Sequence, residues 1–275
     1  MQAKEKFAEN LINAIENNKI KLPTQPEVAV RLRECVDDPN LTSDKLAKVI
    51  SHDPALAAKF IQIANSPLNR GEVTVSSLPS VISRLGLKYV ANIAVGMAME
   101  QIFQATNENI DKLMYEVWSS STHVAAYANV LAKKYTKVPS DIASLAALMH
   151  QIGVLPILSY AQDRDEIAQD VDFLKLLIKE HHAKIGEAVL VSWKFPIEIA
   201  KIPKQLQFGV DNPNEKSDLI YVVQAALLKT KEDNKLFLDY DVPNDVLKQL
   251  NLEDALNTEQ FKNELQHSMK FYCQL

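Results

Sequence analysis

Residues 75–103 read VSSLPSVISRLGLKYVANIAVGMAMEQIF, and this stretch decides the fold class. A serine pair near its start is a candidate helix cap, and Gly86 is a candidate C-terminal stop. Between them the apolar residues recur at helical spacing, which predicts an amphipathic helix. Residues 87–103 are nearly all apolar or small, so the following helix is expected to be buried.

The same helical period extends outward in both directions. The pair Asp53-Pro54 combines a capping side chain with a proline suited to the first turn of a helix. Further helices are expected at 110–135, 141–151 and 182–194, and residues 203–218 have the composition of a loop. Only 6 of the 275 residues are glycine, and neither a GxGxxG nor a GxxxxGK[ST] motif occurs, which disfavours Rossmann and P-loop folds. The chain is therefore predicted to be all-α.

The composition of the chain indicates which classes of binding partner and which cellular compartment to expect. The net charge is −5, and the only adjacent basic pair noted is Lys133-Lys134, which disfavours nucleic acid as a partner. No apolar run reaches the ~18 residues of a membrane span, and the charged N-terminus does not resemble a signal peptide. Cys35 and Cys273 are too few for a disulfide scaffold. We therefore expect a cytoplasmic protein with reduced thiols and no membrane association.

Three of the six histidines stand in informative contexts. His123 lies in the middle of the expected helix 110–135, His150 lies near the end of an apolar helix, and His182 is expected to open the helix 182–194. His182 points along an apolar stripe, and His150 shares a face with small residues that permit close helix approach. A single histidine of this kind is more often a hydrogen-bonded core residue than a ligand. Three on separate helices suggest a shared site.

Carboxylates are scarce around these histidines. A hydrolytic metal site usually combines histidines with carboxylates and leaves a position open for water. Only Glu180 and Glu187 stand near them in the sequence, and the His52-Asp53 doublet is interpreted as a helix cap.

The order and spacing of several blocks resemble the HDOD domain, a bacterial signalling domain related to HD metal-dependent phosphohydrolases. The N-terminal blocks are LPTQPEVAVRLRECVDDPN, ISHDPALAAKFIQIANSP and VSSLPSVISRLGLKYV; the later ones are LAALMHQIGVL, HAKIGEAVLVSWKFP and IYVVQAALL. The resemblance runs from about residue 22 to 230, and the tail beyond is uninformative. It implies a two-lobed HDOD/HD-like helical bundle, with an N-terminal lobe at 1–105 and an HD-like lobe with C-terminal helices at 106–275.

The resemblance also assigns positions to the metal ligands of the HD pattern. His123 matches the first histidine, His150 the histidine of the His-Asp doublet, and His182 the histidine before the Ile-Gly pair. Gln151 stands in place of the doublet aspartate. The position of a later histidine falls among Lys204, Gln205 and Gln207.

The substitution at the doublet weakens the case for a metal. A glutamine side chain is neutral and offers one carbonyl oxygen, so the set is a poor match for magnesium or manganese. Three histidines leave weak binding of a divalent or transition metal open. These positions are therefore expected to be vestigial, with no intact metal site and no cofactor.

The resemblance thus implies a non-catalytic bacterial signal-transduction module that binds a signalling protein, with binding of a nucleotide signal as a further option. The sequence leaves the oligomeric state and the identity of the partner open. The alternative is a metal-dependent phosphohydrolase or phosphodiesterase of nucleotides or cyclic dinucleotides, which would use His123, His150 and His182 in an altered metal site.

Overall fold

The computed structural model describes most of the chain. The described residues are 6–7, 9–11, 13, 24–66, 69, 71–209, 218–243, 245–250, 252, 256 and 258–273. They contain helices and connecting segments, and no β-strand is found among them. The prediction of an all-α fold is confirmed.

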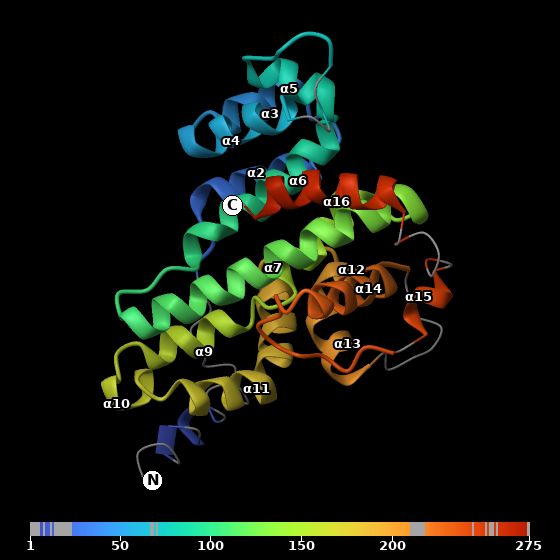
Figure 1. Ribbon diagram of the computed structural model, residues 1–275. Helices are drawn as coiled ribbons and strands as arrows, with labels where there is room; N and C mark the ends of the chain where they lie inside the picture. The colour runs from blue at the N-terminus through green and yellow to red at the C-terminus, as the bar shows by residue number, and fades with distance from the viewer. Residues whose placement is uncertain are drawn as a thin grey trace.

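Figure 1 shows how the helices are arranged along the chain. Those of the first half are α2 (Glu27–Asp37), α3 (Ser43–Ile50), α4 (Pro54–Ala64), α5 (Leu78–Leu85), α6 (Leu87–Ala98) with a 3-10 turn η1 (Met99–Ile102), and α7 (Glu108–Tyr135). Those of the second half are α8 (Ser140–Met149), α9 (Val154–Ala161), α10 (Asp165–Ala168), α11 (Val171–Ser192), α12 (Ile197–Ala200), α13 (Ile202–Phe208), α14 (Asp218–Glu232), α15 (Val246–Gln249) and α16 (Glu259–Tyr272).

Local chemistry sets several helix ends as the sequence predicts. The Asp53 side chain accepts hydrogen bonds from two backbone N–H groups at the start of α4, and Ser77 caps α5 in the same way. Gly86 has a φ of 96°, a left-handed conformation that favours glycine, and the chain bends there by 112° between α5 and α6. This sharp turn lets an amphipathic helix lead directly into a buried one.

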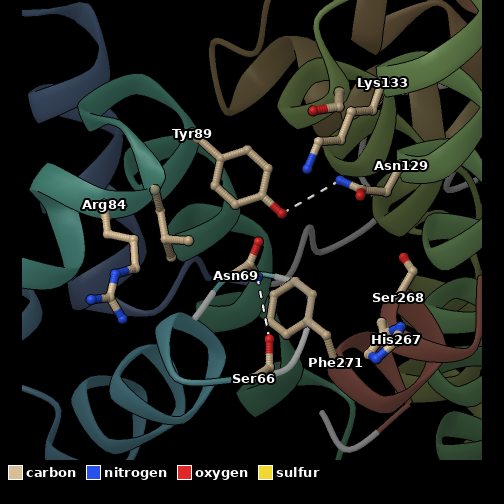
Figure 2. Close-up of a pocket in the computed structure, with 11 residues that line it drawn as sticks. Ser66, Asn69, Arg84, Tyr89, Asn129, Lys133, His267, Ser268 and Phe271 are labelled. Atoms are coloured by element: carbon tan, nitrogen blue, oxygen red, sulfur yellow. Dashed lines mark hydrogen bonds between the residues drawn. The ribbon is translucent and has the colours of Figure 1, made fainter. Parts of the chain in front are cut away.

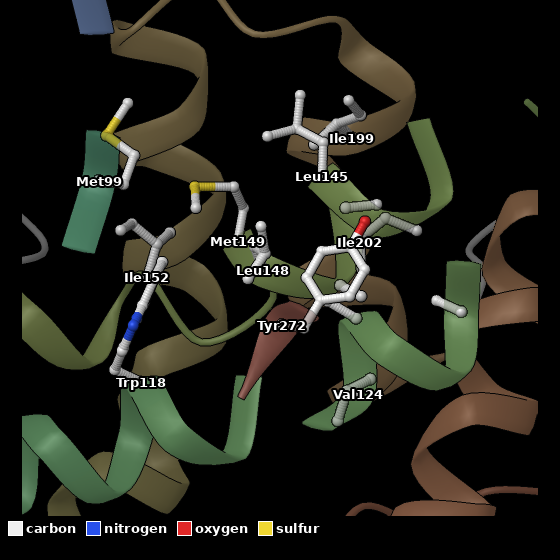
Figure 3. Packing of buried hydrophobic residues seen from close by; sticks show 14 of the residues in the cluster. Met99, Trp118, Val124, Leu145, Leu148, Met149, Ile152, Ile199, Ile202 and Tyr272 are labelled. Carbon is white, nitrogen blue, oxygen red and sulfur yellow. The ribbon is translucent and has the colours of Figure 1, made fainter. Parts of the chain in front are cut away.

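The long helix α7 forms the axis of the molecule. It packs against α8, α9, α14 and α16 (Figure 1). One face of α7 is fully enclosed because Val117, Val124, Ala128 and Leu131 all lie in the core. Figure 3 shows part of this core, in which residues of α7, α8, α12 and α16 meet.

Helix α6 connects the two ends of the molecule. It packs on α2 and on α8, while α3, α4 and α5 group at one end (Figure 1). The Asn92 amide of α6 donates a hydrogen bond of 2.7 Å to the Asp141 carboxylate of α8. The division into lobes at residues 105 and 106 remains a prediction.

Two local predictions are wrong. His182 does not open a helix, because α11 begins at Val171 and places His182 in its middle. The expected loop at 203–218 begins with helix α13, in which Pro203 occupies the first turn, where its missing N–H costs no hydrogen bond. Residues 210–217 lie outside the described part of the chain.

One segment is long and apolar enough to cross a membrane. It comprises α8 and α9, Ser140–Ala161, and 89% of it is buried inside the protein. Burial of this extent is typical of a core segment in a soluble protein.

Candidate histidine site

His150 and His182 meet around one tyrosine. His150 follows the last residue of α8, and His182 lies in α11; their exposed fractions are 0% and 1%. The ring centroid of Tyr240 lies 5.7 Å from that of His150 and 5.8 Å from that of His182. Tyr240 belongs to the non-helical segment between α14 and α15. The site is therefore assembled from three distant parts of the chain.

A glycine brings the two helices close enough for this contact. A Cβ atom at Gly153 would lie 1.9 Å from the carbonyl oxygen of His182 and 2.4 Å from the backbone nitrogen of Gly186. Neither backbone atom can move without shifting α11. The start of α9 thus runs directly along the backbone of α11, and this fixes the preceding His150 and Gln151 beside His182.

Hydrogen bonds orient both imidazoles in the same way. Nδ1 of His150 donates to the carbonyl of Ala147 at 2.5 Å, and Nδ1 of His182 donates to the carbonyl of Ile178 at 2.8 Å. A carbonyl oxygen can only accept, so Nδ1 carries the hydrogen and Nε2 is the acceptor on each ring. His182 Nε2 accepts from the Tyr240 hydroxyl at 3.1 Å. His150 Nε2 has no hydrogen-bond partner among the described residues.

Burial keeps the whole cluster uncharged. Loss of hydration lowers the pKa of both His150 and His182 to about 4, and it raises the pKa of the Tyr240 phenol. The neighbouring His182 also disfavours a positive charge on His150 and contributes, after burial, to its lowered pKa. At neutral pH the site holds two neutral imidazoles and a neutral phenol.

Gln151 adds no charge to this cluster. It is fully buried, and its carboxamide lies beside the Tyr240 phenol. Neither of its polar atoms has a hydrogen bond of good geometry with a described residue. Three buried polar atoms, two on Gln151 and Nε2 of His150, are thus left without a partner there.

The third histidine does not complete a metal-binding group. His123 is half-buried in α7, and its Nδ1 donates to the carbonyl of Ser119 at 2.7 Å. Within the described ranges, no three His, Cys, Asp or Glu side chains are placed to hold a metal ion. The structure therefore brings together two of the three histidines with Gln151.

The other positions noted in the sequence lie apart from this pair. Glu187 of α11 faces Lys204 of α13, with 3.9 Å between the carboxylate and Nζ. Glu180 lies 3.7 Å from the ring of His181. Gln205 and Gln207 are half-buried in α13. These residues supply no carboxylate to the cluster around Tyr240.

Tyr240 is not among the site residues predicted from the sequence. It lies 58 residues after His182, in a tail that showed no motif. A local signal was present, because buried Leu238 and Tyr240 alternate with exposed Asp239 and Asp241, as expected for an extended segment with one face inward. That signal indicates burial but does not say which site the tyrosine covers.

Comparison with known proteins settles the family. The HDOD domain family matches residues 22–205, which is about two thirds of the chain. The chain belongs to the HDOD domain family. Its match includes His123, His150, Gln151 and His182 but ends before Tyr240.

Solved structures share this HDOD architecture. A Shewanella amazonensis SB2B protein, provisionally named a metal-dependent phosphohydrolase, is 28% identical with a TM-score of 0.82; the alignment covers 99% of this chain and 100% of that one. A Marinobacter aquaeolei VT8 protein, provisionally named a signal transduction protein, is 21% identical with a TM-score of 0.69 over 98% of this chain and 65% of that one. An HDOD domain protein of unknown function from Geobacter sulfurreducens is 17% identical, with a TM-score of 0.64 over 98% and 89% of the two chains.

A curated relative is longer than this chain. An uncharacterized protein of Treponema pallidum (strain Nichols) is 22% identical over 235 residues, which are 81% of this chain. The chain spans 44% of the length of that relative.

The residues present do not fit the divalent metal centre that the HD relationship implies. Such a centre needs carboxylate oxygen and an open coordination position. Here the doublet position holds a neutral carboxamide, and the Tyr240 hydroxyl already engages Nε2 of His182. The arrangement is instead a buried, uncharged junction between α8, α11 and the C-terminal segment.

Proposed function

We propose that this HDOD chain is a non-catalytic regulatory module of bacterial signal transduction that acts by binding a protein partner. The observation that carries the proposal is the closed cluster of His150, Gln151, His182 and Tyr240, which lacks a carboxylate. Family membership and the name of the Marinobacter protein support a role in signalling.

The chemistry of phosphoester hydrolysis explains why this cluster argues against catalysis. Metal-dependent hydrolases hold one or two cations that generate hydroxide from bound water and neutralise the charge that develops on the phosphate. Gln151 brings no negative charge to balance such cations. The phenol ring of Tyr240 covers both imidazoles, so a substrate phosphate has no path to them unless the segment 233–243 moves.

The alternative function is a metal-dependent phosphohydrolase with an altered site. One observation favours it: both imidazoles have Nδ1 anchored to a backbone carbonyl and Nε2 as the accepting nitrogen, which is the orientation that metal ligands adopt. The name of the Shewanella relative points the same way. This alternative requires Tyr240 to leave the two rings and a metal to replace it.

A turnover assay separates the two functions. The purified full chain would be incubated with a chromogenic phosphodiester and with cyclic di-GMP, each with added Mn²⁺ or Mg²⁺. We expect the same background rate for the wild type and for His150→Ala. Turnover that depends on His150, together with about one or two bound metals per chain, would overturn the proposal.

A genetic test addresses the regulatory role directly. In cells that lack this chain, the variant His150→Gln is expected to restore the wild-type trait, because a module that acts through its surface does not use this imidazole. Circular dichroism of the purified variant would first establish that it folds. Failure of a folded His150→Gln variant to complement would count against action through the surface.

A further inference from the structure

A separate cavity lies where α5 and α6 meet α7 and α16 (Figure 2). Its volume is about 240 Å³, and it shares no described lining residue with the cluster around Tyr240. The side chains around it come from both ends of the molecule. Arg84 belongs to α5, Tyr89 to α6, Lys133 to α7 and His267 to α16.

The charged groups around this cavity are all basic. Arg84 and Lys133 line it together with the imidazole of His267, and none of the described lining residues is Asp or Glu, although the chain as a whole has a net charge of −5. Neither Arg84 nor Lys133 forms an ion pair with another described side chain. The Arg84 guanidinium donates to the backbone carbonyls of Ala64 and Val73, which hold it in place but do not neutralise it.

The acidic residues closest in sequence to the lining are Glu72, Asp141 and Glu264, and none of them forms an ion pair with Arg84 or Lys133. Asp141 accepts the hydrogen bond from Asn92, and Glu264 forms a 2.8 Å ion pair with Lys134. Burial and, to a smaller extent, the nearby Asp141 carboxylate raise the pKa of the Tyr89 phenol, so this carboxylate lies close to the cavity. It does not pair with Arg84 or Lys133, and both cations are therefore available to a ligand.

Uncharged groups complete the lining. The Asn129 amide donates to the Tyr89 hydroxyl at 3.4 Å, and it is also held by Ser144 and Tyr272 in the core. Figure 2 shows the rings of Tyr89 and Phe271 bordering the cavity. Aromatic rings offer a flat apolar face to a sugar or a base, whereas the basic side chains suit an anionic group.

We propose that this cavity binds a small phosphomonoester. The basic side chains would contact the phosphate, and the rings of Tyr89 and Phe271 would contact the organic part. A volume of about 240 Å³ lies below the ~300–1,000 Å³ of pockets for drug-sized ligands, so the ligand is no larger than a mononucleotide. The inference goes beyond the proposed regulatory role and does not depend on it.

The position of the cavity between helices implies that a bound ligand would affect how those helices are held together. Because the cavity is lined from α5 and α6 on one side and from α7 and α16 on the other, a bound phosphomonoester would link these helices. Binding would then stabilise the relative placement of the two ends of the molecule.

Calorimetric titration of the full chain tests the proposal. The compounds are AMP, ribose phosphate, inorganic phosphate and adenosine, each titrated into the wild type and two variants. Lys133→Gln removes an exposed charge at the cavity, and Lys112→Gln makes the same change on an exposed residue near the other end of α7. Both lysines are exposed, so neither variant is expected to disturb folding, and thermal unfolding would check this.

We expect AMP or ribose phosphate to bind, and Lys133→Gln to weaken this binding about tenfold or more, as loss of a charge-assisted hydrogen bond does. Lys112→Gln should leave the affinity unchanged. The proposal is overturned if no ester binds, if Lys133→Gln has no more effect than Lys112→Gln, or if adenosine binds as well as AMP. Equal affinity for inorganic phosphate and both esters would overturn the assignment of an organic phosphate.

Discussion

Acidification should destabilise this protein through His150 and His182. The pKa of each imidazole is about 4 in the folded state because of burial, against an ordinary value of 6.5. Below about pH 6.5 the unfolded chain takes up protons on these residues, whereas the folded chain does not until about pH 4. Their contribution to stability is therefore fully present above about pH 6.5 and is lost as the pH falls toward 4.

The size of the effect follows from the two shifts. Each corresponds to about 3 kcal/mol of stability at neutral pH, since one unit of pKa is worth about 1.4 kcal/mol. Together they approach ~6 kcal/mol, which is comparable with the whole stability of many domains, about 5–15 kcal/mol. We therefore expect the free energy of unfolding to fall by several kcal/mol between about pH 6.5 and about pH 4.

Urea unfolding at a series of pH values would measure this loss. The wild type is compared with the double variant His150→Gln/His182→Gln, because carboxylates contribute equally to both and cancel in the difference. The double variant should lose less stability between about pH 7 and about pH 4.5. His52→Gln alters an exposed histidine outside this cluster and serves as the control variant. Parallel curves for the wild type and the double variant would refute the argument.

Three further substitutions test particular contacts. Gly153→Ala places a Cβ against the backbone of α11 and should destabilise the fold by ~3 kcal/mol or prevent folding; a wild-type melting temperature would contradict the close approach. Tyr240→Phe leaves Nε2 of His182 without its hydrogen bond and should lower the free energy of unfolding, measured with denaturant, by about 1–3 kcal/mol. An unchanged unfolding midpoint would show that this hydrogen bond does not stabilise the fold. Asp53→Ala removes the cap of α4 and should lower the free energy of unfolding by about 1 kcal/mol in the same assay. An unchanged free energy would show that water replaces the carboxylate as the cap.

Local signals predicted much of the fold. Asp53, Ser77 and Gly86 set helix ends through interactions within a few residues, and these are visible in the sequence. Helix α11 begins at Val171, 11 residues before the predicted start at His182, and Leu174, Leu177 and Ile178 in its first turns have helical spacing and are buried. In α13, Pro203 is a poor loop signal, because a proline in the first turn is compatible with a helix.

The candidate site was harder to predict. The pairing of His150 with His182 followed from their apolar faces and from the HDOD resemblance. His123 also lies in an apolar helix and matches the HDOD pattern, yet it is only half-buried. A long helix presents neighbouring residues on different faces, so its sequence context does not fix which of them point inward. The closure by Tyr240 depends on a contact across 58 residues, which no local pattern encodes.

The late position of Tyr240 in the chain also bears on how the protein is made. Synthesis proceeds from the N-terminus, so α8 and α11 leave the ribosome before the segment that covers their histidines. Until Tyr240 arrives, the two imidazoles remain hydrated and are free to take up protons or metal ions. The segments that follow α14 then expel this water and join α16 to α7, where Tyr272 becomes fully buried. An interrupted translation product would thus display an exposed histidine pair that the finished protein hides, and it would differ from the finished protein in its affinity for metal resins.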